Sequence, residues 1–332
     1  MMMQTPPLAE GAIELRDGVQ TGQTPAGEEV VSNGKPGDVR ISICIPTWRD
    51  GADALLCNLA RMPGAEQCTL SVFDDGSQDP ALTRHLTRQI MRYPGPARLI
   101  CAPANKGRSH ARNRLFELAE TDWILFLDAD MQPDDDAFLT RYLTAIEAQA
   151  APTLIAGGFS LLHAHPTAQT RLHAAQSVTS ECVSAEVRAE APGRYVFSSN
   201  ILVHRDILSA VAFDPAFIGW GWEDVEWGLR VAETFPVSHI DNCATHLGLD
   251  TDEKLIEKYA SSADNFYKLV ERHADAMHET PLYRVAKRLS SVWGLSILQA
   301  VSRRIALLRI LPIKVRLFAL KLFRASVYGS RL

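Results

Sequence analysis

Short apolar segments alternate with expected helical segments along residues 39–130. Of all features of the sequence, this alternation restricts the possible folds most strongly. Apolar runs of this length, separated by helices, are typical of parallel strands that are buried on both faces. We therefore predict an α/β domain with a mostly parallel central sheet flanked by helices. The expected strands are residues 39–48, 68–73, 97–103 and 122–130, and the expected helices between them are residues 53–61 and 108–120.

Three of the expected strands end in polar residues. "IPTW" closes the first strand, "DDGS" follows the second, and "DAD" ends the fourth. The carboxyl ends of neighbouring parallel strands meet at one edge of the sheet, and ligands of doubly wound domains bind outside that edge. The sequence therefore predicts a binding site there.

The remaining segments set the expected domain boundaries. Residues 1–38 are rich in Gly, Pro, Glu and Thr and lack apolar periodicity, which predicts a disordered leader. Residues 39–275 form the expected α/β domain, whose second half mixes strands and helices. Residues 276–332 form a basic amphipathic helical tail. No internal repeat is apparent.

The cellular compartment is predicted from what the chain lacks. Its six cysteines share no CxxC spacing, which favours reduced thiols over disulfides or a zinc site. The first residues have no basic segment followed by an apolar one, so no secretory signal is expected. No uninterrupted apolar run approaches the length that spans a bilayer. We therefore expect a cytoplasmic protein.

Charge is distributed unevenly along the chain. Residues 280–332 contain eleven Lys or Arg and no Asp or Glu, whereas residues 1–279 contain 23 basic and 39 acidic residues. Basic residues spaced among long apolar ones predict helices, broken near Pro312, that lie on the anionic inner face of the cell membrane. A helical hairpin packed on the main domain with its basic face in water is the alternative. No nucleic-acid partner is expected, because the main domain is acidic.

The acids of "FLDADMQPDD" suggest a metal site. Asp128 and Asp130 flank one small residue at the end of an apolar strand, so their carboxylates point the same way and can hold a hard cation against phosphate. The alternative is a strand exit followed by an acidic turn.

Two further motifs suit a nucleotide. A carboxylate of "DDGS" can accept a hydrogen bond from a nucleobase N–H or a ribose hydroxyl, although an ordinary turn with an Asp cap gives the same pattern. "NKGRSHARN", residues 105–113, opens a helix with glycine and basic side chains, which suits a diphosphate. A solvated basic face is the alternative there.

In this order, "IPTW", "DDGS", "NKGRSHARN", "DAD" and "GWGWEDVEWGLR" resemble the family-2 type glycosyltransferases with the GT-A fold. The resemblance covers roughly residues 40–250. It implies a nucleotide-sugar donor, a divalent metal on its diphosphate, usually Mn²⁺ or otherwise Mg²⁺, and transfer with inversion at the anomeric carbon.

The resemblance also assigns the donor-side residues by position. Asp128 corresponds to a contact to the ribose or the donor sugar, and Asp130 to the direct metal ligand. His246, in "CATHLG", falls where several relatives supply a second metal ligand, and His239 is the weaker candidate. The remaining nucleotide-binding residues implied by the resemblance are Pro46, Thr47, Asp75 and Arg112.

The acceptor side is assigned to "GWGWED", which resembles the acceptor loop of β-galactosyl- and N-acetylhexosaminyl-transferring relatives. By that resemblance Asp224 is the general base, and Glu223 binds sugar hydroxyls. Trp220 and Trp222 offer flat faces to sugar C–H groups. Many relatives carry Gly-Gly before the acids, whereas this chain has Gly-Trp, which alters the space for donor or acceptor. An aromatic-rich helix entry with an acidic cap is the alternative, and Trp227, at helical spacing, is expected in the core.

Together these features predict an inverting glycosyltransferase. It would move a hexose or N-acetylhexosamine from a UDP-sugar to a glycan or lipid-linked glycan, by analogy in surface polysaccharide or lipopolysaccharide assembly. Two alternatives remain open. A nucleotidyltransferase acting on a sugar phosphate uses a similar sheet, but "IPTWRDG" lacks its Gly-rich basic signature. A non-catalytic glycan-binding homologue would use the tryptophans alone.

Overall fold

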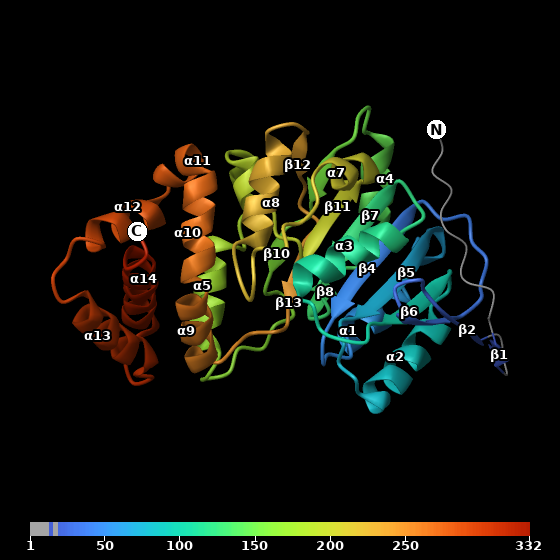
Figure 1. Ribbon diagram of the computed structural model, residues 1–332, viewed down its shortest axis with the longest axis horizontal. Coiled ribbons are helices and arrows are strands. Elements are labelled where there is room, and N and C mark those ends of the chain that lie inside the picture. Colours follow the sequence, from blue (N-terminus) through green and yellow to red (C-terminus); the bar gives the residue numbers. More distant parts are fainter. Residues whose placement is uncertain (1–12, 16–18) are drawn as a thin grey trace.

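The computed structural model describes residues 13–15 and 19–332, and its centre is a ten-stranded sheet with helices on both faces (Figure 1). The strand order is β1-β2-β3-β6-β5-β4-β7-β11-β9-β12. The strands are β1 Ile13–Leu15, β2 Val19–Gln23, β3 Glu29–Ser32, β4 Ile41–Thr47, β5 Cys68–Asp74, β6 Ala97–Cys101, β7 Trp123–Leu127, β9 Leu154–Ala156, β11 Asn200–His204 and β12 Val237–His239. Strands β6, β5, β4 and β7 are parallel to one another, which confirms the parallel sheet expected from the sequence.

A second, three-stranded sheet has the order β10-β13-β8. Its strands are β8 Met131–Pro133, β10 Phe159–Ser160 and β13 Ala244–His246. Strand β13 runs antiparallel to β8, with His246 opposite Met131. This pairing brings a late segment of the chain beside the end of β7.

The helices cover the main sheet and then continue beyond it. The main-domain helices are α1 Asp53–Leu59, α2 Pro80–Arg92, α3 Arg108–Leu118, α4 Phe138–Glu147, α5 Arg171–Ser180, α6 Ala185–Ala189, α7 Arg205–Ala210, α8 Glu223–Ala232, α9 Asp252–Ser261 and α10 Ala263–Arg272, with short 3₁₀ turns η1 Ala65–Gln67 and η2 Pro192–Tyr195. The C-terminal helices are α11 Ala274–His278, α12 Pro281–Leu289, α13 Leu295–Leu307 and α14 Ile313–Gly329.

Strand β4 is buried on both faces at the centre of the sheet. Its side chains alternate, so Ile41, Ile43 and Ile45 join the core under α1, α2 and α4, while Cys44 joins the core under α3, α7 and α8. Burying each large apolar side chain contributes roughly 1.5–3 kcal/mol. The two cores therefore hold β4, and the start of the loop that follows it, in a fixed position.

Residues 19–32 differ from the predicted disordered leader, because they form β2 and β3 and extend the sheet through β6. Strand β3 is anchored by the buried side chain of Val30, and Glu28 beside it pairs with Arg114 of α3 at 2.7 Å. Asn33 continues the attachment by hydrogen bonding to the backbone of residues 90–97. Residues 1–12 and 16–18 of the predicted leader lie outside the described residues.

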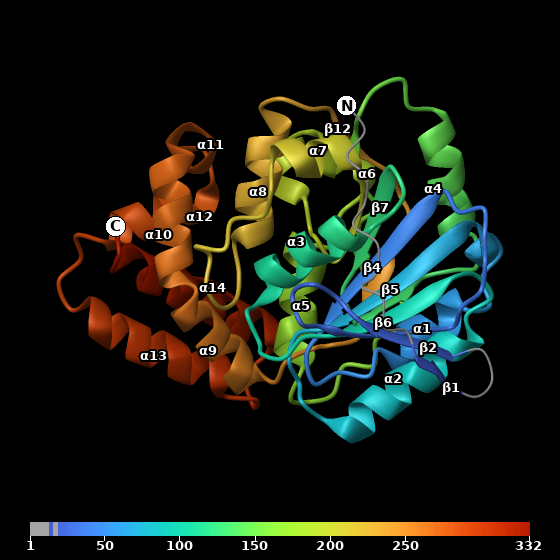
Figure 2. The ribbon, with the colours of Figure 1, turned by 45° about the vertical axis from the view of Figure 1, so that its right-hand side comes forward.

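The C-terminal tail packs on the main domain as well as projecting from it. Helix α14 lies against α5, α9, α10 and α12, and Arg316 on it donates to Asp252 of α9 at 2.6 Å. The predicted break falls at Pro312, which precedes the first residue of α14. Helix α13 and the loops at its two ends form the outer edge of the molecule, at the end remote from the sheet (Figures 1 and 2). Within the described residues, no helix is both long enough and apolar enough to cross a membrane.

Candidate functional site

The ends of β4, β5 and β7 meet at one edge of the sheet, where the sequence predicts the site. Thr47 lies opposite Asp74 in the parallel pairing, and the amide of Asp75 donates to the carbonyl of Thr47 at 2.9 Å. The Thr47 hydroxyl donates to the carbonyl of Asp50 at 2.7 Å, and Pro46 is half-buried beside it. The three expected nucleoside-pocket residues are therefore neighbours.

The carboxylate of Asp75 organises the loop that enters α3. It accepts hydrogen bonds from the amides of Lys106, at 3.1 Å, and Gly107, at 2.8 Å. The loops also touch at Gly76, where an added Cβ would lie 2.3 Å from the backbone of Ala104. Asp75 thus joins two site loops, a structural role that the sequence did not predict.

Arg112 contacts the first acid of the D-x-D motif. Its guanidinium donates to Asp128 at 2.6 Å and lies 4.0 Å from Glu223. Arg112 is almost fully buried, and its Nε and one Nη atom have no hydrogen-bond partner among the described residues. The guanidinium also lies 5.8 Å from the ring centre of Phe213. Arg112 therefore positions Asp128 and connects it to the acids at the start of α8.

Asp130 and His246 are adjacent because β13 pairs with β8. The His246 Nε2 atom lies 3.1 Å from Asp130 Oδ2. Gly248 makes this arrangement possible, since a Cβ there would lie 2.0 Å from the same oxygen. Burial would lower the pKa of His246, but the hydrogen bond and charge of Asp130 outweigh it and raise that pKa.

The donor set of Asp130 and His246 suits a divalent cation that is also bound by a substrate. A carboxylate oxygen and an imidazole nitrogen together match Mn²⁺ better than either Ca²⁺ or a thiolate-preferring ion. In residues 13–15 and 19–332, no group of three or more His, Cys, Asp or Glu is arranged to hold a metal. His239 does not join the pair, because its ring nitrogens contact Arg188 and the carbonyl of Pro192.

The segment "GWGWED" turns sharply into α8. Trp222 precedes the helix with φ of 76°, a left-handed conformation that is unusual for a side chain of this size, and Gly221 has φ of 93°. Glu223 is buried and accepts a hydrogen bond from Arg108 of α3 at 3.0 Å. Burial, followed by the charge of Glu223, raises the pKa of Asp224 to about 7. A carboxyl with that pKa can take a proton near neutral pH.

The two expected sugar-stacking tryptophans also make internal contacts. Trp220 packs edge-on against Tyr259 at 5.6 Å between ring centres. Trp222 packs against Phe266, and its indole N–H donates to the hydroxyl of Tyr328 at 3.2 Å. Both remain partly exposed, so each keeps some ring surface free.

Trp227 lies in the core, as predicted. Its side chain is fully buried and its ring stacks on Phe213 at 4.3 Å between ring centres. Arg230 pairs with Glu226 at 2.9 Å, one turn apart on α8.

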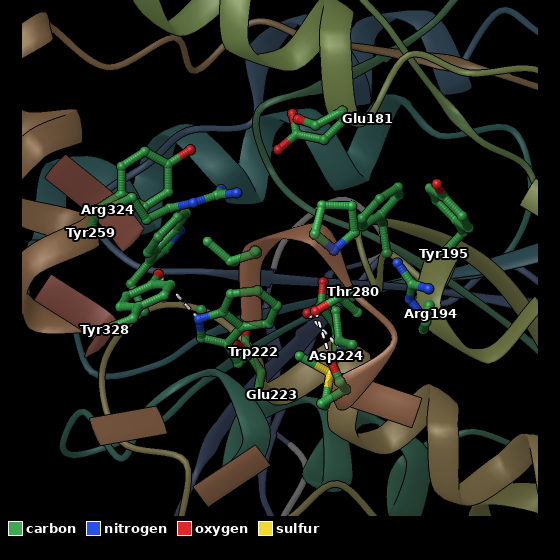
Figure 3. Close-up of a pocket in the computed structure, with 18 of the residues that line it drawn as sticks. Glu181, Arg194, Tyr195, Trp222, Glu223, Asp224, Tyr259, Thr280, Arg324 and Tyr328 are labelled. Carbon is green, nitrogen blue, oxygen red and sulfur yellow. Dashed lines mark hydrogen bonds between the residues drawn. The ribbon is translucent and has the colours of Figure 1, made fainter. Parts of the chain in front are cut away.

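A pocket of about 430 Å³ opens over Asp224 (Figure 3). It includes all four residues expected on the acceptor side, and also Arg108 from the segment expected to suit a diphosphate. The pocket lining does not include Pro46, Thr47, Asp75, Arg112, Asp128, Asp130 or His246. Its other walls come from the end of α5, from η2, from α9 and from the C-terminal helices. The wall residues that the sequence did not predict include Glu181, Arg194, Tyr195, Tyr259, Thr280, Arg324 and Tyr328.

These wall residues were missed because nothing in their local sequence marks them. Arg194 stands alone in η2, and Tyr259 has the apolar helical spacing of a core residue. Arg324 and Tyr328 belong to the basic tail, whose composition suggested a membrane instead. Only the packing of α14 on α9 and α10 brings them to the pocket.

Residues 42–159 match the family described as "Glycosyl transferase family 2". These residues, about a third of the chain, are therefore similar to a family 2 glycosyltransferase domain. The GT-A architecture expected from the sequence is confirmed by the sheet and by the likeness to solved structures. No curated protein shows significant similarity to the chain.

Two solved structures illustrate the likeness. One is the mannosyltransferase PcManGT from Pyrobaculum calidifontis, in complex with GDP-Man and Mn²⁺, with 16% identity, a TM-score of 0.56, and coverage of 89% of this chain and 90% of that one. The other is glucosyl-3-phosphoglycerate synthase from Mycobacterium tuberculosis, in complex with Mg²⁺ and UDP. It has 16% identity, a TM-score of 0.50, and coverage of 70% of this chain and 79% of that one. At these identities the likeness concerns the fold.

Proposed function

We propose that the protein is an inverting glycosyltransferase that moves a hexose or N-acetylhexosamine from a UDP-sugar to a glycan or lipid-linked glycan. The observation that carries this proposal is the buried Arg112, which contacts Asp128 on one side and lies 4.0 Å from Glu223 on the other. Arg112 thereby links the loops expected to bind the donor to the pocket over Asp224. A single displacement needs such an arrangement, because donor and acceptor must meet at one carbon.

On the donor side, Pro46, Thr47 and Asp75 would line the nucleoside pocket, with Asp128 near the ribose or the sugar. Asp130 and His246 would hold the divalent cation, Mn²⁺ or Mg²⁺, which when bound neutralises charge on the leaving diphosphate. The similar structures support a nucleoside diphosphate and such a cation, since one contains GDP-Man with Mn²⁺ and the other UDP with Mg²⁺.

On the acceptor side, Asp224 would remove the proton of the attacking hydroxyl. The new bond joins that oxygen to the anomeric carbon as the bond to the nucleoside diphosphate breaks. A pKa of about 7 keeps a useful fraction of Asp224 ionised at neutral pH while leaving it basic enough to accept a proton. Glu223, Trp220 and Trp222 would bind the acceptor sugar.

The alternatives are less well supported. A nucleotidyltransferase would have no use for a general base in an aromatic pocket away from the strand ends. A non-catalytic glycan-binding protein would have no use for the adjacent Asp130 and His246. The family 2 match over residues 42–159 favours glycosyl transfer over both.

We further propose that the protein is cytoplasmic and docks on the inner face of the cell membrane, consistent with a lipid-linked acceptor in surface polysaccharide assembly. Among the described residues, large exposed apolar side chains occur on α13, on the loops at its two ends and on the first turns of α14: Val292, Trp293, Ile297, Val301, Leu308, Ile310, Val315 and Phe318. Basic residues interleave with them, and acids are absent from residues 280–332. Apolar side chains among cations suit an anionic lipid surface.

The activity is tested by nucleotide release. The purified protein is incubated with UDP-glucose, UDP-galactose, UDP-N-acetylglucosamine or GDP-mannose, with Mn²⁺ or with EDTA. We expect slow metal-dependent release of UDP from one UDP-sugar, with water replacing the acceptor. Release of GDP alone would reassign the donor, and no release from any sugar would contradict the proposed activity.

A further inference from the structure

The loop that leads into α8 is tied to helix α10 by donors on one side of that helix. At the start of the loop, Arg272 of α10 pairs with Asp214 at 2.5 Å. Lys268 donates to the carbonyl of Ala216 at 2.6 Å. Asn265 is a further donor of α10, and the spacing of these positions along the helix places them on one side of it. Helix α10 therefore fixes the path of the loop at more than one point.

Asn265 makes the contacts that lie nearest to the start of α8. Its side chain is buried, and its Nδ2 atom donates to the carbonyls of Ile218 and Gly221, each at 3.0 Å. An amide nitrogen carries two N–H groups, one for each carbonyl. The two carbonyls lie on either side of residues 219 and 220, so this single amide closes the last part of the loop.

The turn that Asn265 holds is strained. Gly221 has φ of 93° and Trp222 has φ of 76°, and the second value is unfavourable for a residue that has a Cβ atom. Such a conformation persists only where the surrounding structure holds it. The carbonyl of Gly221 belongs to the peptide group that joins these two residues. The hydrogen bond from Asn265 therefore fixes the orientation of that peptide group.

This turn determines where the carboxylate of Asp224 lies. Trp222 directly precedes α8, and its carbonyl accepts the amide of Glu226 at 2.9 Å in the first turn of the helix. Trp222 provides no side-chain cap, so the entry of the helix depends on the turn before it. Asp224 is the second residue of α8. A turn that relaxes would therefore displace the carboxylate together with the first turn of the helix.

We propose that Asn265 is a positioning residue, whose two hydrogen bonds hold the left-handed turn at Trp222 and thereby aim the carboxylate of Asp224 at the acceptor hydroxyl. This inference rests on the proposed function. The pocket lining does not include Asn265, so this side chain acts through the turn and does not touch the acceptor. A misplacement of about 1 Å in a reacting group can lower a rate by roughly 10²-fold.

The test measures release of UDP with Mn²⁺ and with water as the acceptor, by the unmodified protein and by Asn265→Leu. The probes are UDP-glucose, UDP-galactose and UDP-N-acetylglucosamine. Leucine is similar in size to asparagine but donates no hydrogen bond. We expect kcat, counted per UDP-binding site measured by calorimetry, to fall by about 10–100-fold. KM for the UDP-sugar should stay unchanged, because the contacts of Asn265 lie on the acceptor side. An unchanged kcat would overturn the inference.

Lys268→Met is the matched control. It removes a hydrogen bond from α10 to the same loop, but at Ala216, away from the strained turn. Arg272 still pairs with Asp214 at that end of the loop. We therefore expect the kcat of the unmodified protein. A loss as large as that of Asn265→Leu would show that any loosening of the loop has this effect, and the assignment to Asn265 would be wrong.

A second substitution shows whether Asn265 acts through the base. In a protein that already carries Asp224→Asn, Asn265→Leu should cause little further loss of kcat, because a base that is absent cannot be misplaced. A further loss equal to that in the unmodified background would indicate a general structural role. That result would also overturn the inference.

Asn265→Ser covers the case in which Asn265→Leu fails to fold and binds no UDP. A serine hydroxyl can donate to one of the two carbonyls at most, so kcat should still fall, and a normal kcat would overturn the inference. If the unmodified protein binds UDP but releases none from any UDP-sugar, the proposed function fails and the role of Asn265 fails with it. Full release by a folded Asn265→Leu would overturn the role of Asn265 alone.

Discussion

Asp224 is the residue on which the proposed chemistry depends most. It lies in the aromatic pocket at the start of α8, and its pKa is raised to about 7 by burial and by the charge of Glu223. We expect Asp224→Asn to lower kcat by about 10²–10⁴-fold, the usual loss when a general base is removed. UDP binding measured by calorimetry should be unchanged, because Asp224 lies outside the donor loops. A variant with full activity would exclude Asp224 as the base.

The pH dependence of kcat/KM should report the same group. A general base must be ionised, so activity should rise with pH through a midpoint near 7 instead of near the ordinary aspartate pKa of about 3.9. Glu223→Gln removes a negative charge beside Asp224 and frees Arg108, and both changes favour the ionised form of Asp224. The midpoint should therefore move to lower pH in Glu223→Gln. A midpoint that is unchanged or higher would contradict this electrostatic account.

The sequence predicts the acids of the site better than it predicts their partners. Asp128 and Asp130 are marked by their position after an apolar strand, which is a local property. The hydrogen bonds that the amides of Lys106 and Gly107 donate to Asp75 depend on how two loops meet, which local sequence does not encode. The position of Arg194 in the pocket wall could not be predicted either, because only tertiary packing brings η2 to the pocket.

At the scale of elements, helix α14 of the tail contacts the segment "GWGWED", which we expect to bind the acceptor, through Tyr328. The Tyr328 hydroxyl lies 2.7 Å from that of Ser262 and accepts a hydrogen bond from Trp222. Tyr328→Phe would leave two polar groups without this partner, so we expect the free energy of unfolding to fall by about 1–3 kcal/mol in urea titrations. Because Trp222 lines the pocket, acceptor KM should also rise while UDP affinity stays constant. Unchanged stability and KM would show that the tail is not coupled to the loop.

The parallel strands of the sheet could be predicted from the sequence, but strands β1, β2 and β3 could not. Strands β4, β5 and β7 are apolar enough to be recognised alone. Strand β2 has the sequence VQTGQ, which carries little apolar periodicity, and it is stabilised by pairing with β3. A segment of this kind is recognised as a strand only once its partner is known.

At the scale of the whole molecule, the tail packs on the main domain, which is one of the two arrangements that its sequence allowed, and it also exposes apolar side chains. Helix α14 packs on the domain, yet Trp293 is 96% exposed and Ile310 is 91% exposed. Trp293→Ser combined with Ile310→Ser should lower binding to vesicles of phosphatidylglycerol and phosphatidylcholine by at least ~10-fold in a flotation assay, because each buried apolar side chain contributes roughly 1.5–3 kcal/mol.

The matched control for the vesicle experiment is Leu162→Ser. Leu162 is 67% exposed and lies outside the tail, so its loss should leave vesicle binding unchanged. Raised salt should weaken binding of the unmodified protein, since the basic residues act through screened attraction. Vesicle binding that survives the double substitution would exclude the α13 region as the docking surface.

We propose that the strand ends form a metal-dependent nucleotide site, and calorimetry with UDP in the presence of Mn²⁺ or EDTA is the experiment that tests this site. We expect binding that requires Mn²⁺, is lost in Asp130→Ala, and is retained in Asp136→Ala, which removes a nearby exposed acid. Binding of UDP that ignores both Mn²⁺ and Asp130 would contradict the metal assignment. Absence of UDP binding in the unmodified protein would contradict the assigned donor site itself.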